Sequence, residues 1–460
     1  MKIVLIGAGQ VGGTLAENLA SEANDITVID PDGHLLRELQ DRLDIRTVAG
    51  HGSHPDILVA AGIEDADMLV AVTNSDEVNM TACQVAHSLF RTPTKIARVR
   101  SGSYTQGDYR ERLFGDKNMP VDVLITPEQV VTDFIYKLLE HPGTLQALDF
   151  AGGAVQLIAI RARADGPMVG HPLMDIGKQM PGVEARAAAI WRRDRPIVPT
   201  AETVIREGDE VFFVASSANI RKVMKEIRRT EKPYRRVMIA GGGNIGYRLA
   251  RTLEHHYHVK VIEYDAERGE YLAEHLDKAV VLQGQAANRE LLLEENIDTI
   301  DVFVAVTNDD EVNIMASLLA KRLGVRKVMT LITNPVYADL MQGSEIDIAI
   351  SPQQATTSSL LSHVRRGDTL KVHSLRRGAA EALEIVAHGD AKTSKVIGRC
   401  IEDINLPPGA TIGALVRGKE VIIAHHNTEI EPEDHVIVFM TDKSHIRDIE
   451  KLFQVGFTFF

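Results

Sequence analysis

The chain has little cysteine, no long apolar run and no excess of basic residues. Its two cysteines, Cys83 and Cys400, are too few for a disulfide framework or a thiolate zinc site, which favours a reducing compartment. No segment approaches the ~18 consecutive apolar residues of a membrane-spanning helix, and the first ten residues lack the charged and apolar regions of a secretory signal. We therefore expect a cytoplasmic protein that reaches a membrane only through a membrane-embedded partner.

The charge balance disfavours two classes of ligand. Lys and Arg number 51 against 64 Asp and Glu, which gives a formal net charge of −13. A protein that binds nucleic acid or anionic lipid over its whole surface needs a net basic face, so both are disfavoured, although a local basic site is not excluded. The 460 residues correspond to about three or four domains.

The sequence contains an internal duplication. The matching pairs are 2–20 with 236–254, 67–79 with 301–313, and 126–131 with 351–356. The first two pairs share an offset of 234 residues, and the second of them is identical at ten of its thirteen positions. The third pair has an offset of 225, so the preceding loop is shorter in the second half. The duplication covers the chain.

Each half changes character partway. Residues 1–140 alternate continuous Val/Ile/Leu-rich runs with helix-period segments, which predicts βαβ units around a parallel sheet covered on both faces. Residues 148–230 contain short strands, charged turns and one helical segment, which is typical of a small α+β module. We predict an α/β protein with two Rossmann-like parallel-sheet domains, each followed by a small α+β domain. The expected boundaries are 1–145, 146–230, 231–365 and 366–460.

A crossover helix is expected between the two modules of each half. The helix-start signals are Thr126-Pro127 with Gln129, and Ser351-Pro352 with Gln354. Ser or Thr at the N-cap, Pro at the first helical position and Gln at the third favour a helix start. The first of these helices is either an ordinary core helix or a contact between copies of the chain. The Lys- and Arg-rich segment 228–236 is expected to be a solvated linker between the halves.

The first half carries a glycine-rich phosphate motif. The run Gly7-Ala8-Gly9-Gln10-Val11-Gly12 follows an apolar strand and opens an amphipathic helix, the context that a dinucleotide-binding motif requires. The glycines permit a tight turn, close approach of a pyrophosphate and close helix–strand packing, and the helix N-terminus offers N–H groups to phosphate. Asp30, at the end of the second strand, can accept hydrogen bonds from ribose hydroxyls and repel a 2′-phosphate. This favours NAD(H) or an adenosine ligand over NADP; the alternative is a vestigial, empty crevice.

The second half keeps the same spacing. Gly241-Gly242-Gly243-Asn244-Ile245-Gly246 repeats the glycine motif, and Glu263 closes the strand that follows. We predict a second nucleotide site here, in which the longer Glu side chain shifts the ribose.

Polar pairs follow the fourth strand of each half. Thr73-Asn74 and Thr307-Asn308 stand where parallel α/β sheets bind ligands, at the carboxyl ends of strands near the switch point. Each Asn lies three residues before a Glu, which also fits a helix cap, so capping and ligand contact both remain open for Asn74 and Asn308.

Two arginines are predicted in the next strand of the first half. Arg98 and Arg100 lie in IARVR, and alternate residues of a strand share a face, so both guanidinium groups can reach one phosphate. The matched stretch of the second half, VMTLIT, has no arginine. The first site is therefore expected to accept more phosphate charge, and the arginine pair could distinguish ATP from ADP.

No catalytic constellation accompanies these sites. His51 and His54 are two possible metal ligands without a third, so a loop near the nucleotide is favoured, and Cys83 is expected in the core. The cluster His255, His256 and His258 is expected in a solvated turn. We predict no catalytic residue, no metal site and no enzyme. An NAD-dependent oxidoreductase is the rival class, and a DNA-binding redox sensor is a third, disfavoured by the acidic charge.

The motifs GAGQVGGTLAENLA, DMLVAVTN, SPQQAT and LPPG together resemble the regulatory subunits of bacterial Trk potassium-uptake systems, the TrkA family, over essentially the whole chain. This resemblance implies two RCK (regulator of K⁺ conductance) halves, each with a Rossmann-like N-domain and a small C-domain. It implies a homo-oligomer, peripheral to the inner face of the membrane, that binds NAD(H) and ATP or ADP and assembles with the Trk potassium-translocating membrane subunit. It places ligand contacts on Gly7 to Val11, Asp30, Thr73, Asn74, Arg98 and Arg100.

The chain departs from this family at one position. RCK domains commonly carry Gly-Asp-Ala after the third strand, whereas this sequence has Gly50-His51-Gly52 and Gly284-Gln285-Ala286. Contacts that need the missing acid are therefore in doubt, most of all in the second half. The apolar segment 455–460, VGFTFF, is expected in a subunit interface or on the membrane partner.

Overall fold

The computed structural model describes eleven parts of the chain. They are residues 1–20, 24–105, 107–115, 117–175, 178, 180–193, 195–227, 232–341, 344–364, 369–376 and 379–455. The chain forms two compact units, of which the first contains Met1–Val130 with Gln353–Val364 and the second contains Val131–Pro352 with Arg365–Phe460. Residues 228–231 of the expected linker and 456–460 of the C-terminal segment lie outside the described residues.

The first unit is built on a six-stranded parallel sheet in the order β3-β2-β1-β4-β5-β6. The strands are β1 (Lys2–Ile6), β2 (Asp25–Asp30), β3 (Arg46–Ala49), β4 (Met68–Ala71), β5 (Thr94–Arg98) and β6 (Val123–Ile125). This is the Rossmann order, in which the chain reverses direction across the sheet between β1 and β4. All four residues of β4 and four of the five in β1 are buried, as expected for continuous apolar strands covered on both faces.

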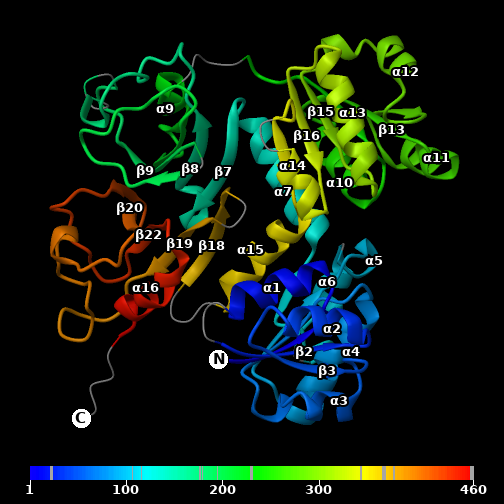
Figure 1. Ribbon diagram of the computed structural model, residues 1–460, viewed down its shortest axis with the longest axis horizontal. Helices are drawn as coiled ribbons and strands as arrows, with labels where there is room; N and C mark the ends of the chain where they lie inside the picture. The colour runs from blue at the N-terminus through cyan, green and yellow to red at the C-terminus, as the bar shows by residue number, and fades with distance from the viewer. Residues whose placement is uncertain are drawn as a thin grey trace. The chain divides into compact units, whose positions relative to one another are not determined.

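Helices cover this sheet, and one of them comes from the second half of the sequence. The helices are α1 (Gln10–Ala20), α2 (Gly33–Gln40), α3 (Pro55–Ala60), α4 (Asp76–Val85), α5 (Gly102–Thr105), α6 (Asp108–Leu113) and α15 (Pro352–Val364). The crossover helix α15 belongs to the first unit and lies beside α1 (Figure 1). The other crossover helix, α7 (Pro127–Glu140), begins in the first unit and continues in the second. Both helices start at the predicted prolines; a contact of α7 with another copy stays a prediction.

The second unit contains the repeated parallel sheet, in the order β14-β13-β12-β15-β16-β17. Its strands are β12 (Arg236–Ala240), β13 (His258–Glu263), β14 (Val280–Gln283), β15 (Val302–Ala305), β16 (Lys327–Leu331) and β17 (Ile348–Ile350). Its helices are α10 (Asn244–Leu253), α11 (Ala266–His275), α12 (Arg289–Glu294), α13 (Asp310–Arg322) and α14 (Pro335–Leu340). The two parallel sheets therefore have the same topology, as the duplication requires.

The second unit also contains two five-stranded antiparallel sheets, ordered β10-β9-β11-β8-β7 and β18-β19-β22-β20-β21. The strands of the first are β7 (Thr144–Phe150), β8 (Val155–Arg161), β9 (Ala185–Arg192), β10 (Arg195–Ile197) and β11 (Glu210–Ser216), followed by helix α9 (Ile220–Ile227). Those of the second are β18 (Thr369–Leu375), β19 (Ala380–Val386), β20 (Ala410–Arg417), β21 (Glu420–Ile423) and β22 (His435–Met440), followed by helix α16 (Ile446–Phe453). A shared core that includes Trp191, Phe212 and Phe439 joins the two sheets.

The expected α/β class is confirmed, with two strands added. The sequence analysis missed β7 and β18, because TLQALDF and TLKVHSL mix polar and apolar residues without a long β-branched run. Their polar groups bond to each other instead: Lys371 Nζ donates to the carbonyl of Asp149 at 3.2 Å. No helix in the described parts of the chain is both long enough and apolar enough to cross a membrane.

Candidate functional sites

The glycine loop of the first half contains two glycines that the fold requires. Gly7 has a φ of +107°, which favours glycine. A Cβ on Gly12 would lie 1.8 Å from the carbonyl oxygen of Gly7, so only glycine allows α1 to pack this closely against the end of β1.

Gly9 is different, because nothing inside the chain requires it. A Cβ built there would meet no atom within 4 Å, and its φ lies outside the left-handed region. The space over Gly9 is open at the N-terminus of α1, where backbone N–H groups favour an anion. In the second half Gly243 has the same open surroundings, with a φ of −64°.

An acidic side chain ties each glycine loop to the second strand of its sheet. One carboxylate oxygen of Asp30 accepts from Ala8 N at 2.7 Å and the other from Asp32 N at 2.8 Å. Glu263 accepts in the same way from Gly242 N at 2.7 Å and Asp265 N at 2.9 Å. Each carboxylate oxygen keeps a further lone pair, so both acids can still accept a hydrogen bond from a ribose hydroxyl.

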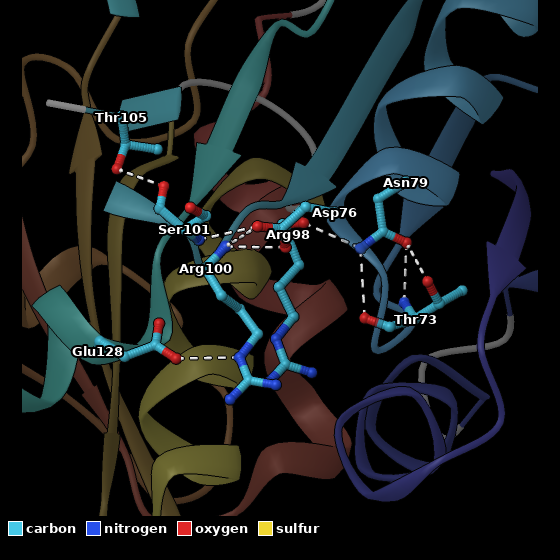
Figure 2. Close-up of polar contacts among 8 residues, drawn as sticks. All are labelled: Thr73, Asp76, Asn79, Arg98, Arg100, Ser101, Thr105 and Glu128. Atoms are coloured by element: carbon cyan, nitrogen blue, oxygen red, sulfur yellow. Dashed lines mark hydrogen bonds and ion pairs between the residues drawn. The ribbon is translucent and has the colours of Figure 1, made fainter. Parts of the chain in front are cut away.

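A buried asparagine that the sequence analysis overlooked organises the carboxyl edge of the first sheet (Figure 2). Asn79 Oδ1 accepts from the N–H of Thr73 at 2.9 Å and from its hydroxyl at 2.7 Å. Asn79 Nδ2 donates to the carbonyls of Thr73 at 3.3 Å and Arg98 at 2.9 Å. Because the Thr73 hydroxyl donates inward, it cannot donate to a ligand at the same time. Asn79 thus fixes the chain after both β4 and β5.

Asp76 fixes the segment that follows. Its carboxylate, 9% exposed, accepts from Arg100 N at 2.9 and 3.0 Å and from Ser101 N at 2.8 Å. The signal for both residues was present in the sequence, since DEVN occurs in each copy of the duplicated block. The sequence does not show what these residues do, because the hydrogen bonds of Asp76 and Asn79 reach backbone groups about 20 residues away.

The expected helix caps at the two asparagines are wrong by one residue. Ser75 caps α4, accepting from Val78 N, and Asp309 caps α13, accepting from Val312 N. Asn74 and Asn308 are exposed, and no hydrogen bond is found for either side chain within the described residues. Ser and Asp are strong caps, which leaves both asparagines available for another role.

The arginine pair lies at the same edge of the first sheet, although the expected strand is shorter than predicted. β5 ends at Arg98, and Arg100 follows it in the segment held by Asp76. The two guanidinium groups nevertheless point in the same direction (Figure 2). Arg100 Nε donates to Glu128 Oε1 at 3.1 Å, and the Arg100 side chain is 44% exposed.

Arg98 has no such partner. Its Nε is buried and makes no hydrogen bond, and no ion pair to its guanidinium is found among the described residues. Burial lowers the pKa of Arg98 from its usual value, and the positive charge of Arg100 lowers it further. A half-buried cation without a bonded counter-charge is costly, and a phosphate oxygen would offset that cost.

The second half repeats the framework without the cations. Asn313 bonds Thr307 at 2.9, 2.7 and 3.1 Å and the Leu331 carbonyl at 3.1 Å, and Asp310 accepts from Thr333 N and Asn334 N. Leu331 and Thr333 therefore stand where the first half has Arg98 and Arg100.

The second half has a different cation near its glycine loop, which the sequence analysis did not identify. Arg268 Nε donates to the Gly242 carbonyl at 2.9 Å, and its guanidinium lies 4.6 Å from the ring centroid of Tyr271. A Cβ on Gly242 would lie 2.2 Å from Leu272 Cδ1, so a larger residue here would require the Leu272 side chain to move. The two loops thus have the same spacing but different neighbours.

The loop after the third strand explains part of the departure from Gly-Asp-Ala. A Cβ on Gly52 would lie 2.2 Å from Ile6 Cγ2, so alanine cannot occupy this position in the observed packing. His51 and His54 have ring centroids 5.4 Å apart and no third ligand beside them within the described residues. A metal site at this loop is therefore not supported.

One other cluster has the residue types of a metal site. Ligand atoms of Glu254, His255 and Asp277 lie within 4.8 Å of one another, at the end of α10 and before β14. His255 and His256 are exposed in a turn, as expected, whereas His258, although exposed, is the first residue of β13. Glu254 Oε2 accepts from Lys278 N and Ala279 N, which gives this carboxylate a structural role of its own.

Two domain families match the chain, each of them once in the first half and once in the second half. Residues 3–127 and 237–352 match the TrkA-N domain, and residues 157–228 and 390–454 match the TrkA-C domain. The chain is 63% identical over 460 residues to the Trk system potassium uptake protein TrkA of Halomonas elongata, covering 100% of both chains. It is 58% identical over 454 residues to the protein of that name from Vibrio alginolyticus, covering 99% of each.

Solved structures share the fold at low identity. The RCK domain of GsuK aligns with a TM-score of 0.59 and 17% identity, over 98% of this chain and 94% of that one. A GsuK channel described as bound to NAD aligns with a TM-score of 0.60 and 18% identity, over 98% of this chain and 78% of that one. These likenesses show that the chain shares the fold of these structures.

Proposed function

The chain belongs to the family of Trk system potassium uptake proteins, and from that premise we propose that it is a nucleotide-responsive gate for a potassium-translocating membrane subunit. Family membership makes it a regulatory component of K⁺ transport and not an enzyme. This excludes the oxidoreductase that the glycine motif alone could also have indicated. The identity of the nucleotide, the residues that bind it and the conformational control are the proposal.

The half-buried guanidinium of Arg98, with no hydrogen bond or ion pair in the described parts of the chain, carries the proposal. It lies beside Arg100, at the carboxyl edge of the sheet where Rossmann folds bind ligands. The name first cradle is used for Gly7–Gly12, Asp30, Thr73–Asn74 and Arg98–Arg100. The name second cradle is used for Gly241–Gly246, Glu263 and Thr307–Asn308.

The first cradle fits a nucleotide with several phosphates. The open space at Gly9 and the N–H groups of α1 suit a pyrophosphate, Asp30 suits a ribose, and Arg98 with Arg100 suits a further phosphoryl group. We propose ATP, ADP and NAD(H) as ligands of the first cradle. The second cradle keeps the open glycine and the acid but has no arginine after β16, so we propose that it binds fewer phosphates.

Gating requires a difference in affinity. A nucleotide shifts a conformational equilibrium only when it binds one conformation more tightly, and typical coupling is ~1–3 kcal/mol per site. ATP and ADP differ by one phosphoryl group, so Arg98 and Arg100 could convert that difference into a preferred conformation. In a homo-oligomer, the coupling free energies of the several copies would add.

We propose that the protein lies at the cytoplasmic side of the membrane as a homodimer or tetramer, bound to a Trk-type membrane subunit. We also propose that residues 1–145 and 231–365 form the nucleotide-binding domains, and that residues 146–230 and 366–460 form the small domains.

Titration of the purified full chain with ATP, ADP and NADH tests the proposal. The wild-type protein should bind all three, and Arg98→Gln should weaken ADP by about tenfold or more, since a charged hydrogen bond contributes ~1.5–3 kcal/mol. Arg100→Gln should bring the ATP and ADP affinities closer together. A wild-type chain that binds no adenine nucleotide would contradict the proposal, as would turnover of a nicotinamide substrate.

A further inference from the structure

A side chain from the second half of the sequence reaches the glycine loop of the first half. Gln353 is the second residue of α15, which belongs to the first unit. Its Nε2 donates a hydrogen bond to Oε1 of Gln10, the first residue of α1. Gln353 is 8% exposed, whereas Gln10 is exposed. A buried amide thus bonds to an exposed one in the glycine loop of the first cradle.

We propose that Gln353 is a positioning residue for the first nucleotide site, acting through the side-chain amide of Gln10. This inference rests on the proposed function, since it names how that site is made competent for phosphate. A primary amide has an acceptor end and a donor end. Because Gln353 donates to the Oε1 end of Gln10, the NH₂ end remains for a ligand, and it has no partner within the described residues.

The choice of end matters because phosphate oxygens only accept hydrogen bonds. Gln10 stands at the N-terminus of α1, beside the open space at Gly9. With its NH₂ end held available, Gln10 adds a donor to the N–H groups of the helix. With the amide reversed, the same side chain would present a carbonyl oxygen and repel the phosphate.

The matched position of the other crossover helix shows what a change of residue type does. Glu128 corresponds to Gln353 in the duplication, and its carboxylate accepts from Arg100 Nε at 3.1 Å. The chain therefore has an acceptor where the neighbour is a cation, and a donor where the neighbour is an amide oxygen. Gln353→Glu would replace that donor by an acceptor, and Gln10 would turn its NH₂ end toward the new carboxylate.

The contact also makes the site sensitive to α15. Gln10 is held in its phosphate-binding orientation only while α15 stays in place, so movement of this helix lowers the affinity for the nucleotide. By thermodynamic reciprocity, a bound nucleotide must then stabilise the position of α15. This links occupancy of a site in the first half to a helix of the second half.

Affinities of the full chain for ADP and for adenosine test this inference. Gln353→Glu should weaken ADP by about tenfold and Gln353→Ala by about threefold, as expected for one oriented hydrogen bond. Adenosine has no phosphate, so its affinity should change by less than about twofold. In a Gln10→Ala background, Gln353→Glu should have almost no further effect on ADP.

Gln84→Glu is the matched control, because it adds the same charge on α4, where Gln84 Nε2 bonds only Ser88 Oγ among the described contacts. It should leave ADP binding unchanged. Hydrogen exchange in α15 should slow when ADP is added to the wild-type chain and respond less in Gln353→Ala.

The inference is overturned if Gln353→Glu binds ADP as the wild type does, if adenosine weakens equally, or if the loss persists undiminished without Gln10. Should Gln353→Glu fail to fold, the Gln353→Ala comparison and its Gln10→Ala double variant decide. A wild-type chain that binds no ADP overturns the proposed function and this inference together, whereas wild-type binding with unaffected variants overturns this inference alone.

Discussion

Replacing Gly9 by alanine should separate ligand binding from folding in the first cradle. The new Cβ meets no atom within 4 Å, and a compatible Gly→Ala change gains ~0.4–1 kcal/mol through the unfolded state. The carbonyl of Gly9 accepts from Gly13 N at 2.7 Å, which makes Gly9 the residue before the helix, where alanine costs a similar amount. The two terms nearly cancel, so stability should change by less than about 1 kcal/mol.

Gly12→Ala provides the contrast. Its Cβ would lie 1.8 Å from the Gly7 carbonyl oxygen, which forces α1 away from the sheet at a cost of about 3 kcal/mol or more. The melting temperature of Gly9→Ala should therefore stay within about 4 °C of the wild type, while that of Gly12→Ala falls well below it.

Nucleotide binding by Gly9→Ala should be impaired although its fold is intact. The methyl group of Gly9→Ala fills the space that a pyrophosphate would occupy. The affinities for ADP and NADH should therefore decrease by about tenfold or more. Calorimetric titration of the folded variant measures this, with Gly243→Ala as the same change in the second cradle. Unchanged ADP affinity in a stable Gly9→Ala protein would refute the assignment of this space to a ligand.

Other substitutions test the framework and the charges. Arg98→Gln should leave stability unchanged or raise it by about 1 kcal/mol, since it removes a half-buried cation without a bonded partner; a marked loss of melting temperature would show that Arg98 is structural. Asn79→Ala should lower stability by about 2–4 kcal/mol, because it leaves buried backbone groups unsatisfied, and an unchanged melting curve would contradict the role given to Asn79. Burial lowers the pKa of His373 to about 4, so the folded chain resists protonation that the unfolded chain accepts below ~6.5. Stability should therefore decrease as pH falls from ~6.5 toward 4, by less than the ~3 kcal/mol of the full shift because the residue is partly exposed; His373→Gln should remove this slope, and an identical slope in that variant would assign it elsewhere.

The parallel sheets were predictable because their signals are local. Continuous apolar runs, glycines at fixed spacing and an acid about 20 residues later all fall within short segments. The duplication then supplied a second copy of each signal, so β1 and β12, or β4 and β15, supported one another.

The parts that were missed depend on contacts between distant segments. Asn79 acquires its role from the carbonyl of Arg98, 19 residues away. The carbonyl of Asp149 in β7 accepts from Lys371 of β18, more than 220 residues away. An Asn three residues before a Glu fits a helix cap, which made Asn74 one of two open alternatives, yet Ser75 is the residue that caps α4. The exchange of α15 into the first unit has no local signal.

Potassium or rubidium flux through the reconstituted membrane subunit, with this chain bound and ATP or ADP added, tests the central claim most directly. The account predicts that flux differs between the two nucleotides with the wild-type chain, and that the difference disappears with Gly9→Ala although the variant still binds the membrane subunit. Equal flux with ATP, with ADP and without nucleotide in the wild type would contradict it.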